Sequence, residues 1–170
     1  MVIRPSRAAD APAMSRIYVQ TWRDTYLSMV PYGYLYEMSA DRHEQTFTSE
    51  INGRQVSSFV AEDAGRVVGF VTGGRERHGN DIYSGEIYTL YVLKHLQRRG
   101  IGKKLVAAQA AQLRQSNMYA MLVRVLKRNP YRRFYRAING TYLKTEHQPF
   151  AGETVDVEVY GWLDTTLITC

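Results

Sequence analysis

A glycine-bearing basic loop, followed at once by a helical pattern, is the segment of the sequence best suited to hold a ligand. It reads Val92-Leu93-Lys94-His95-Leu96-Gln97-Arg98-Arg99-Gly100-Ile101-Gly102-Lys103-Lys104-Leu105. Gly100 and Gly102 let the backbone turn tightly and approach a ligand closely. The first turn of a helix has free N–H groups and the positive end of the helix dipole, which together bind phosphate. The loop therefore predicts a site for a phosphorylated ligand, above all the diphosphate of a nucleotide cofactor.

Two familiar phosphate-binding loops do not fit this segment. A Walker A loop needs Ser or Thr directly after its Lys and a wider glycine spacing, and the residue after Lys103 is Lys104. The dinucleotide fingerprint needs a third glycine where Leu105 stands. From the two glycines alone, an ordinary strand-to-helix loop that uses glycine only for its turn remains open.

Positive charge is concentrated around the same loop. The chain of 170 residues carries 22 Lys and Arg against 16 Asp and Glu, a net charge of +6. Residues 94–136 contain 12 of the basic residues and no acidic residue. A block of one sign attracts a polyanion, either a phosphorylated cofactor or a nucleic acid. Because no helix-turn-helix, RNP or zinc-finger pattern is present, we expect no nucleic-acid partner, and a basic nucleic-acid-binding protein is the weaker alternative.

The longer pattern resembles the GCN5-related N-acetyltransferase (GNAT) family. Gln97, Gly100 and Gly102 follow the strand-like Leu90-Tyr91-Val92, as in the family's motif A, which has Arg or Gln, then Gly three residues on, then Gly or Ala. The segment from Asn129 to Tyr135, followed by Gly140, is similar to the next motif of the family, with a spacing that is close but not identical. Both motifs occur in the family's order, and the resemblance extends over essentially the whole chain.

The resemblance implies a single N-acetyltransferase domain over residues 1–170 and acetyl-CoA as cosubstrate, with no metal. The implied fold is α/β, a mixed, mostly antiparallel twisted sheet flanked by helices, with splayed central strands that admit the pantetheine arm. The backbone of Tyr91, Val92 and Leu93 would then pair with the pantetheine amides. The implied contacts to the diphosphate and the rest of the cofactor come from Gln97, Arg98, Arg99, Gly100, Ile101, Gly102, Lys103 and Asn129.

Acyl transfer from a thioester to an amine requires a base for the ammonium, whose pKa is about 10.4, and an acid for the departing thiolate, whose pKa is about 8.5. Glu86 lies eleven residues before Gln97, a position that holds the catalytic Glu in some family members, and strand alternation places it on one face with Tyr88 and Leu90. The resemblance makes Tyr135 the acid. An ion-paired strand Glu and a core Tyr are the alternatives.

The amine acceptor is less defined than the donor. Weaker base candidates are Glu76 and His78, whereas His95 is expected at the surface. Aromatic side chains that fit an acceptor pocket are Trp22, Tyr26, Tyr32 and Tyr88, although core packing is the stronger alternative for Trp22. The acceptor is expected to be a primary amine on a small molecule or a peptide, and a homodimer stays open. A coenzyme A-binding sensor without catalysis is a further alternative.

The rest of the composition is that of a cytoplasmic protein without a membrane partner. No apolar run approaches the roughly 20 residues of a membrane helix, and no apolar stretch follows the basic residues near the N-terminus. The lone Cys170 cannot form an internal disulfide.

The elements that must position these residues follow from periodicity and breakers. Strands are expected over residues 2–4, 57–62, 66–72, 85–92, 121–126, 141–145 and 154–163. Helices are expected over residues 11–27 with Asp10 as its N-cap, 34–51, 102–115, and from Pro130 to about Asn139 with Asn129 as its cap. The glycines Gly73, Gly74 and Gly79, with Asn80, are expected to form the loop before the central strand.

Overall fold

The computed structural model describes residues 1–168, so Cys170 lies outside the described residues. Its helices are α1 (Ala11–Tyr26), α2 (Tyr32–Glu37), α3 (Ala40–Asn52), α4 (Ile101–Gln115) and α5 (Arg133–Ala137). Its strands are β1 (Val2–Pro5), β2 (Val56–Asp63), β3 (Arg66–Arg75), β4 (Gly85–Val92), β5 (Met121–Leu126), β6 (Thr141–Phe150) and β7 (Glu153–Trp162). Among the described residues, no helix has both the length and the apolar character that a bilayer crossing requires.

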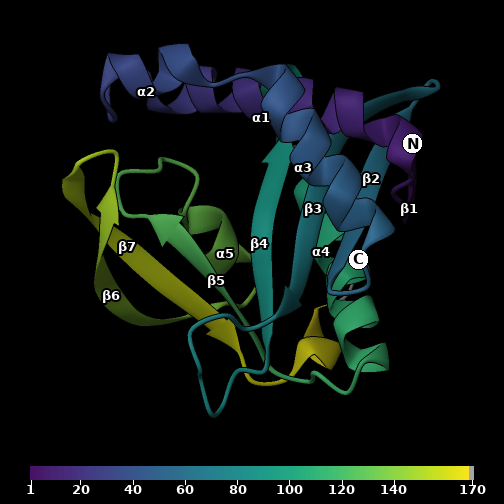
Figure 1. Ribbon diagram of the computed structural model, residues 1–170. Helices are drawn as coiled ribbons and strands as arrows, with labels where there is room; N and C mark the ends of the chain where they lie inside the picture. The colour runs from purple at the N-terminus through teal and green to yellow at the C-terminus, as the bar shows by residue number, and fades with distance from the viewer. Residues whose placement is uncertain (169–170) are drawn as a thin grey trace.

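The strands form one sheet in the order β1-β2-β3-β4-β5-β7-β6, in which only β4 and β5 run parallel (Figure 1). Helices cover both faces of the sheet. On one face Val60 and Phe70 pack against α1 and α3, and on the other Ala61 and Val71 pack against α4. Because successive strand residues point to opposite faces, each strand contributes to both layers of the core.

The two parallel strands separate soon after they meet. β4 pairs with β5 only from Gly85 to Ile87, opposite Met121 to Val123, although the strands continue to Val92 and Leu126. In Figure 1 the ribbons of β4 and β5 diverge toward their carboxyl ends. The splay expected of the central strands is therefore present, and it leaves one backbone edge of β4 without a neighbouring strand.

A β-bulge at Tyr88 changes which side chains share a face of β4. The register with β3 pairs Thr72 with Thr89 but Gly73 with Ile87, so Tyr88 is the extra residue. As a result Ile87 and Leu90 both pack in the core cluster beside α4. The expectation that Leu90 shares a face with Glu86 is wrong, because simple alternation does not continue through a bulge.

Glycines that suggested a loop instead belong to a strand. Gly73 and Gly74 lie within β3, where a Cβ would come within 2.6 Å of the backbone oxygens of Glu86 and Gln55, respectively. These glycines therefore serve close approach of the backbone, and the loop begins only after Arg75. The expected helix over residues 34–51 is two helices, because Ser39 is extended and its side chain caps α3 by accepting from the Arg42 N–H.

Two expected helix caps make other interactions. Asp10 does not cap α1: its carboxylate pairs with Arg4 at 2.7 Å and accepts the Arg7 N–H at 2.8 Å. Asn129 does not start a helix at Pro130, since α5 begins only at Arg133. The Asn129 side chain instead accepts the N–H of Tyr131 at 2.8 Å, which is a local turn that satisfies the backbone without forming a helix.

We expect Gly73→Ala to lower the free energy of unfolding by about 1–3 kcal/mol, because the new Cβ has no room between strands. It would lie 2.6 Å from the Glu86 backbone oxygen and 2.8 Å from Gln109 Nε2. Urea unfolding followed by circular dichroism measures the change. Gly33→Ala is the control, since its Cβ meets nothing within 4 Å in α2 and should be neutral or stabilising. Equal stability of both variants would contradict the close approach of β3 to β4 at Gly73.

Candidate active site

A cleft of about 700 Å³ opens where β4 leaves β5. Its walls are the end of α1, the end of β4, the loop and first turn of α4, and the segment from Asn129 to Ala137. Of the residues expected to bind a cofactor, the structure places these in its lining: Tyr91, Val92, Gln97, Arg98, Gly100, Ile101, Gly102, Lys103 and Asn129. Leu93 and Arg99 do not line the cleft. The Leu93 backbone is already engaged, since its N–H donates to Val68 O and its oxygen accepts from Leu96 N–H.

The loop at one end of the cleft presents backbone donors. Arg98 and Gly100 have φ angles of 63° and 78°, the left-handed conformation that reverses the chain before α4. The first hydrogen bond of the helix runs from Lys104 N to Gly100 O at 3.1 Å. The N–H groups of Ile101, Gly102 and Lys103 precede that bond, as the first donors of any helix do. This end of the cleft therefore suits an anion.

The open edge of β4 forms another wall of the cleft. The Val92 carbonyl, beyond the last residue that pairs with β5, accepts a hydrogen bond from Gln97 Nε2 at 3.0 Å. The motif glutamine thus ties the loop to the end of the strand. Backbone groups on this edge have no strand beside them, so an extended ligand with amide groups matches their hydrogen-bonding capacity.

Two phenols enter the cleft from different helices. Tyr135 of α5 is 9% exposed, and burial raises the pKa of its hydroxyl. Tyr26, at the end of α1, accepts a hydrogen bond from Asn129 Nδ2 at 2.6 Å. Burial raises the pKa of Tyr26 to about 12, although the bond from Asn129 lowers it. Both hydroxyls therefore keep their protons at neutral pH and can act as donors.

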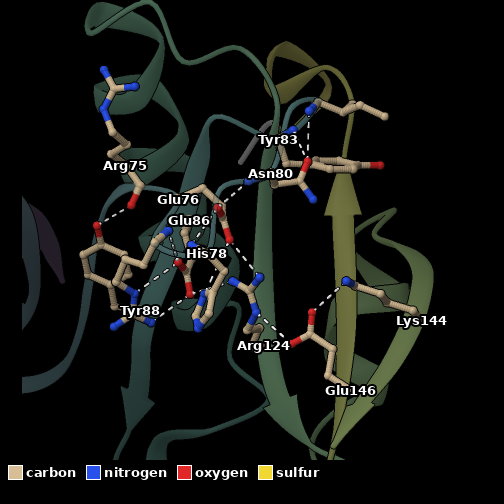
Figure 2. A network of polar contacts seen from close by, with 12 residues as sticks. Arg75, Glu76, His78, Asn80, Tyr83, Glu86, Tyr88, Arg124, Lys144 and Glu146 are labelled. Carbon is tan, nitrogen blue, oxygen red and sulfur yellow. Dashed lines mark hydrogen bonds and ion pairs between the residues drawn. The ribbon is translucent and has the colours of Figure 1, made fainter. Parts of the chain in front are cut away.

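Glu86 lies in an ion-pair network and not in the lining of the cleft (Figure 2). Its side chain is fully buried. Arg77 approaches it with Nη2 at 2.8 Å from Oε1 and Nε at 3.1 Å from Oε2, and Arg124 Nη1 lies 3.2 Å from Oε1. The structure thus brings Tyr135 to the cleft but encloses the Glu86 carboxylate between two guanidinium groups.

Arg124 of β5 is the centre of this network, a role that its place in the basic block did not reveal. It donates to Glu76 Oε1 at 2.8 Å and to Glu146 Oε2 at 3.1 Å, and so links the β3–β4 loop to β6 (Figure 2). Burial alone would raise the pKa of Glu76. Hydrogen bonds from the Asn80 N–H, from Arg124 and from the His78 N–H outweigh it and lower the pKa to about 2.

Glu76, His78 and Glu86 place ligand atoms within 4.8 Å of one another, which is the spacing of a metal site. Both carboxylates are already balanced by guanidinium groups, so their arrangement fits an ion-pair network. His78 is half-exposed and lies 3.5 Å from Glu76 Oε1.

The aromatic residues expected around an acceptor are not gathered in one pocket. Trp22 is buried, stacks on Phe150 and donates to the Tyr91 hydroxyl at 2.8 Å, which is core packing. The Tyr88 ring lies 4.1 Å from the Arg77 guanidinium, and Tyr32 is exposed. Tyr26 alone of the four lines the cleft. His95 is exposed, as expected.

Sequence reasoning missed part of the lining. Cleft residues not expected from the sequence include Thr21, Thr25, Tyr131, Arg133 and Phe134. The position of Phe134 could have been expected from the sequence, since it belongs to the second motif. The Phe134 ring can lie against the first turn of α4 because residue 102 is glycine: a Cβ at Gly102 would lie 3.3 Å from the ring. Thr21 and Thr25 lie one turn apart on α1, and that spacing is the only signal that their positions offered.

Comparisons with known proteins show which family this sequence resembles. The acetyltransferase (GNAT) family matches residues 14–140. The uncharacterized N-acetyltransferase YuaI of Bacillus subtilis is 30% identical over 170 residues, which cover 99% of this chain and 96% of YuaI.

Solved structures share the fold at low sequence identity. YncA of Salmonella typhimurium, solved with acetyl-CoA, has a TM-score of 0.73 at 21% identity over 96% of this chain and 94% of YncA. The PaiA N-acetyltransferase of Thermoplasma acidophilum, in complex with coenzyme A, has a TM-score of 0.70 at 15% identity over 93% of this chain and 98% of PaiA. The mixed sheet with its splayed central strands is thus the fold of these proteins, and with the family match over most of its length, the chain belongs to the acetyltransferase (GNAT) family.

Proposed function

We propose that the protein transfers an acetyl group from acetyl-CoA to a primary amine of a small molecule or peptide, by direct attack in a ternary complex. The observation that carries this proposal is the cleft that joins the anion-binding start of α4 to the open edge of β4. In acetyl-CoA a diphosphate joins the adenosine to the pantetheine arm, which carries two amide groups and ends in the thioester. From the diphosphate onward, its chemistry follows the cleft in the same order.

The chain's own groups divide the cosubstrate between them. The N–H groups of Ile101, Gly102 and Lys103 take the diphosphate, and the side chains of Arg98 and Lys103 add charge. The open edge at Tyr91 and Val92 takes the pantetheine amides. We leave Leu93 out of this pairing, because both its backbone N–H and its oxygen are bonded within the protein. The Val92 oxygen accepts one bond, from Gln97 Nε2, and has a second lone pair for the ligand.

Tyr135 is our proposed acid. The amine nitrogen attacks the thioester carbonyl carbon and, once bonded, releases its extra proton to water. The carbon–sulfur bond breaks, and the sulfur takes the Tyr135 hydroxyl proton, which solvent then replaces. Burial keeps that proton on Tyr135 until the thiolate forms. Before attack the ammonium must lose a proton. We propose that Glu86 receives it through water, since its carboxylate is enclosed by Arg77 and Arg124.

Glu86 depends on its neighbours for its position. Arg124 holds Glu86 and Glu76 together, and Glu76 in turn fixes the loop through the N–H groups of His78 and Asn80, each at 2.9 Å. Removing one carboxylate from such a buried network leaves a guanidinium without its partner, which destabilises the fold. The network can therefore be tested by measuring how loss of a carboxylate changes the free energy of unfolding as well as the activity.

We expect Gly100→Ala to weaken acetyl-CoA binding by at least about tenfold, because a side chain disfavours the left-handed turn that aims the first N–H groups of α4. Isothermal titration calorimetry measures the dissociation constant. Gly79→Ala is a matched control. Gly79 has φ of 75° against 78° at Gly100, and a Cβ at either position meets nothing within 4 Å, but Gly79 lies outside the cleft.

Both variants should lose about 1 kcal/mol of unfolding free energy from the same backbone strain. Only Gly100→Ala should lose affinity. Equal loss of affinity in the two variants, or wild-type affinity in Gly100→Ala, would argue against a diphosphate site at this loop.

The acid and base assignments are tested by the release of free thiol from acetyl-CoA in the presence of a panel of primary amines. Tyr135→Phe and Glu86→Gln should each lower kcat by about 10²–10⁴-fold, the usual contribution of general acid–base groups, with little change in acetyl-CoA affinity. A thiol-reactive dye follows the reaction. Full rates in both variants would refute these roles, whereas acetyl-CoA binding without transfer to any amine in the wild type would favour a coenzyme A sensor.

The Glu76 pKa predicts how stability depends on pH. Its folded pKa of about 2 lies below the ordinary value of 4.5. Glu76 therefore contributes stability above about pH 4.5, on the order of 3 kcal/mol, and this contribution is lost as the pH falls toward 2. Urea unfolding at a series of pH values should show that wild type and Glu76→Gln differ most near neutral pH and converge in acid. The exposed Glu37→Gln variant should follow wild type, and parallel curves for Glu76→Gln would count against the network.

A further inference from the structure

The hydrogen bond between Asn129 and Tyr26 runs from the amide to the phenol oxygen, and this direction leaves the Tyr26 O–H free to donate. Asn129 Oδ1 accepts the N–H of Tyr131 at 2.8 Å, which fixes the orientation of the amide. Asn129 Nδ2 then donates to the Tyr26 oxygen at 2.6 Å. Tyr26 is an acceptor in this contact, so its own O–H proton points elsewhere. Within residues 1–168 that proton has no protein acceptor at hydrogen-bond distance.

The place of Tyr26 in the fold directs this proton to the cleft. Tyr26 lines the cleft together with Tyr135. Its ring packs 4.5 Å from that of Trp22 in the aromatic cluster of α1 and α2, whereas Tyr135 packs in the cluster beside α4. The two phenols therefore belong to different packing layers and meet at one cavity. With 5% of its surface exposed, Tyr26 is held rigidly and has little access to bulk water.

We propose that Tyr26 is a second catalytic phenol, whose O–H donates a hydrogen bond to the carbonyl oxygen of the bound thioester, and that Asn129 is the positioning residue that orients it. The inference rests on the proposed function. It divides the thioester between two donors: Tyr135 serves the sulfur and Tyr26 the carbonyl oxygen. The role of Tyr26 does not follow from the family motifs, because Tyr26 lies in neither motif segment.

The step balances without transfer of the Tyr26 proton. As the amine nitrogen bonds to the carbonyl carbon, the π pair of the carbonyl moves to its oxygen, where the Tyr26 O–H stabilises the developing charge. The nitrogen, which is positively charged after it has bonded, releases one proton to water. When the double bond forms again, the carbon–sulfur pair leaves with the sulfur, which takes the proton of Tyr135. Since burial raises the pKa of Tyr26 to about 12, its proton stays in place as a fixed donor.

A spectroscopic readout separates this role from packing. We would bind acetyl-CoA labelled with ¹³C at the thioester carbonyl and record isotope-edited infrared spectra, because a hydrogen bond lowers the carbonyl stretching frequency. Tyr26→Phe should move the carbonyl band to higher frequency, whereas Tyr135→Phe should leave it in place. With a saturating primary amine from the panel that supports turnover in the wild type, Tyr26→Phe should also lower kcat by about 10²–10³-fold, the usual effect of losing one oxyanion donor.

Two further variants make the test specific. Asn129→Asp keeps an acceptor for the Tyr131 N–H but gives Tyr26 an acceptor in place of a donor, so the Tyr26 proton should turn to the carboxylate and the band should shift as in Tyr26→Phe. Tyr34→Phe is the control, because Tyr34 packs in the same aromatic cluster but outside the cleft lining, and it should leave band and rate unchanged.

The outcomes also distinguish the inference from the proposed function. An unchanged carbonyl band in Tyr26→Phe would overturn the role of Tyr26 while acetyl transfer stands. If the wild type shows no band for bound carbonyl, the protein does not bind acetyl-CoA, and the proposed function is overturned together with the inference.

Discussion

The site depends on the early end of one strand pairing. If β4 and β5 paired along their full lengths, the backbone edge at Tyr91 and Val92 would be occupied and the cleft closed. Pairing stops after Ile87 and Val123. Backbone groups that lose a sheet partner must find another, in water or in a ligand. The unpaired backbone at the end of β4 is thus available as a binding surface, and the cleft lies beside it.

The separated strands are held at a fixed distance by charge as well as by packing. Arg124 projects from β5 to Glu86 on β4 and to Glu76 in the loop before it, and also reaches Glu146 on β6. A buried ion pair contributes little net stability compared with a well-packed apolar contact, because both charges must leave water. A buried ion pair is more specific in its geometry than an apolar contact, and here the contact with Arg124 sets the position of the Glu86 carboxylate between β4 and β5.

The sequence predicted the parts of the site that lie close together along the chain. Gly100, Gly102 and the helix after them form one continuous strand-loop-helix unit. The structure has this unit, and Gly100 makes the tight turn in the left-handed conformation. Contacts across long separations were not predictable in this way. Tyr26 and Asn129 are 103 residues apart, and Arg124 and Glu76 are 48 apart, so nothing local indicates their hydrogen bonds. The bulge at Tyr88 depends on the partner strand, which is why alternation within β4 placed Leu90 on the wrong face.

Contacts between distant parts of the chain also change how the basic block of residues 94–136 is interpreted. Along the sequence residues 94–136 are uniformly positive, but in the fold Arg124, Lys127 and Arg132 pair with carboxylates from other elements. Their charge is therefore largely compensated. Among the described residues, the cations that line the cleft are Arg98, Lys103 and Arg133, none of which pairs with a carboxylate within 4.0 Å. Arg98 and Lys103 lie in the loop and first turn of α4, and Arg133 begins α5, so their uncompensated charge faces the cleft. A small polyanion bound in the cleft gains from it.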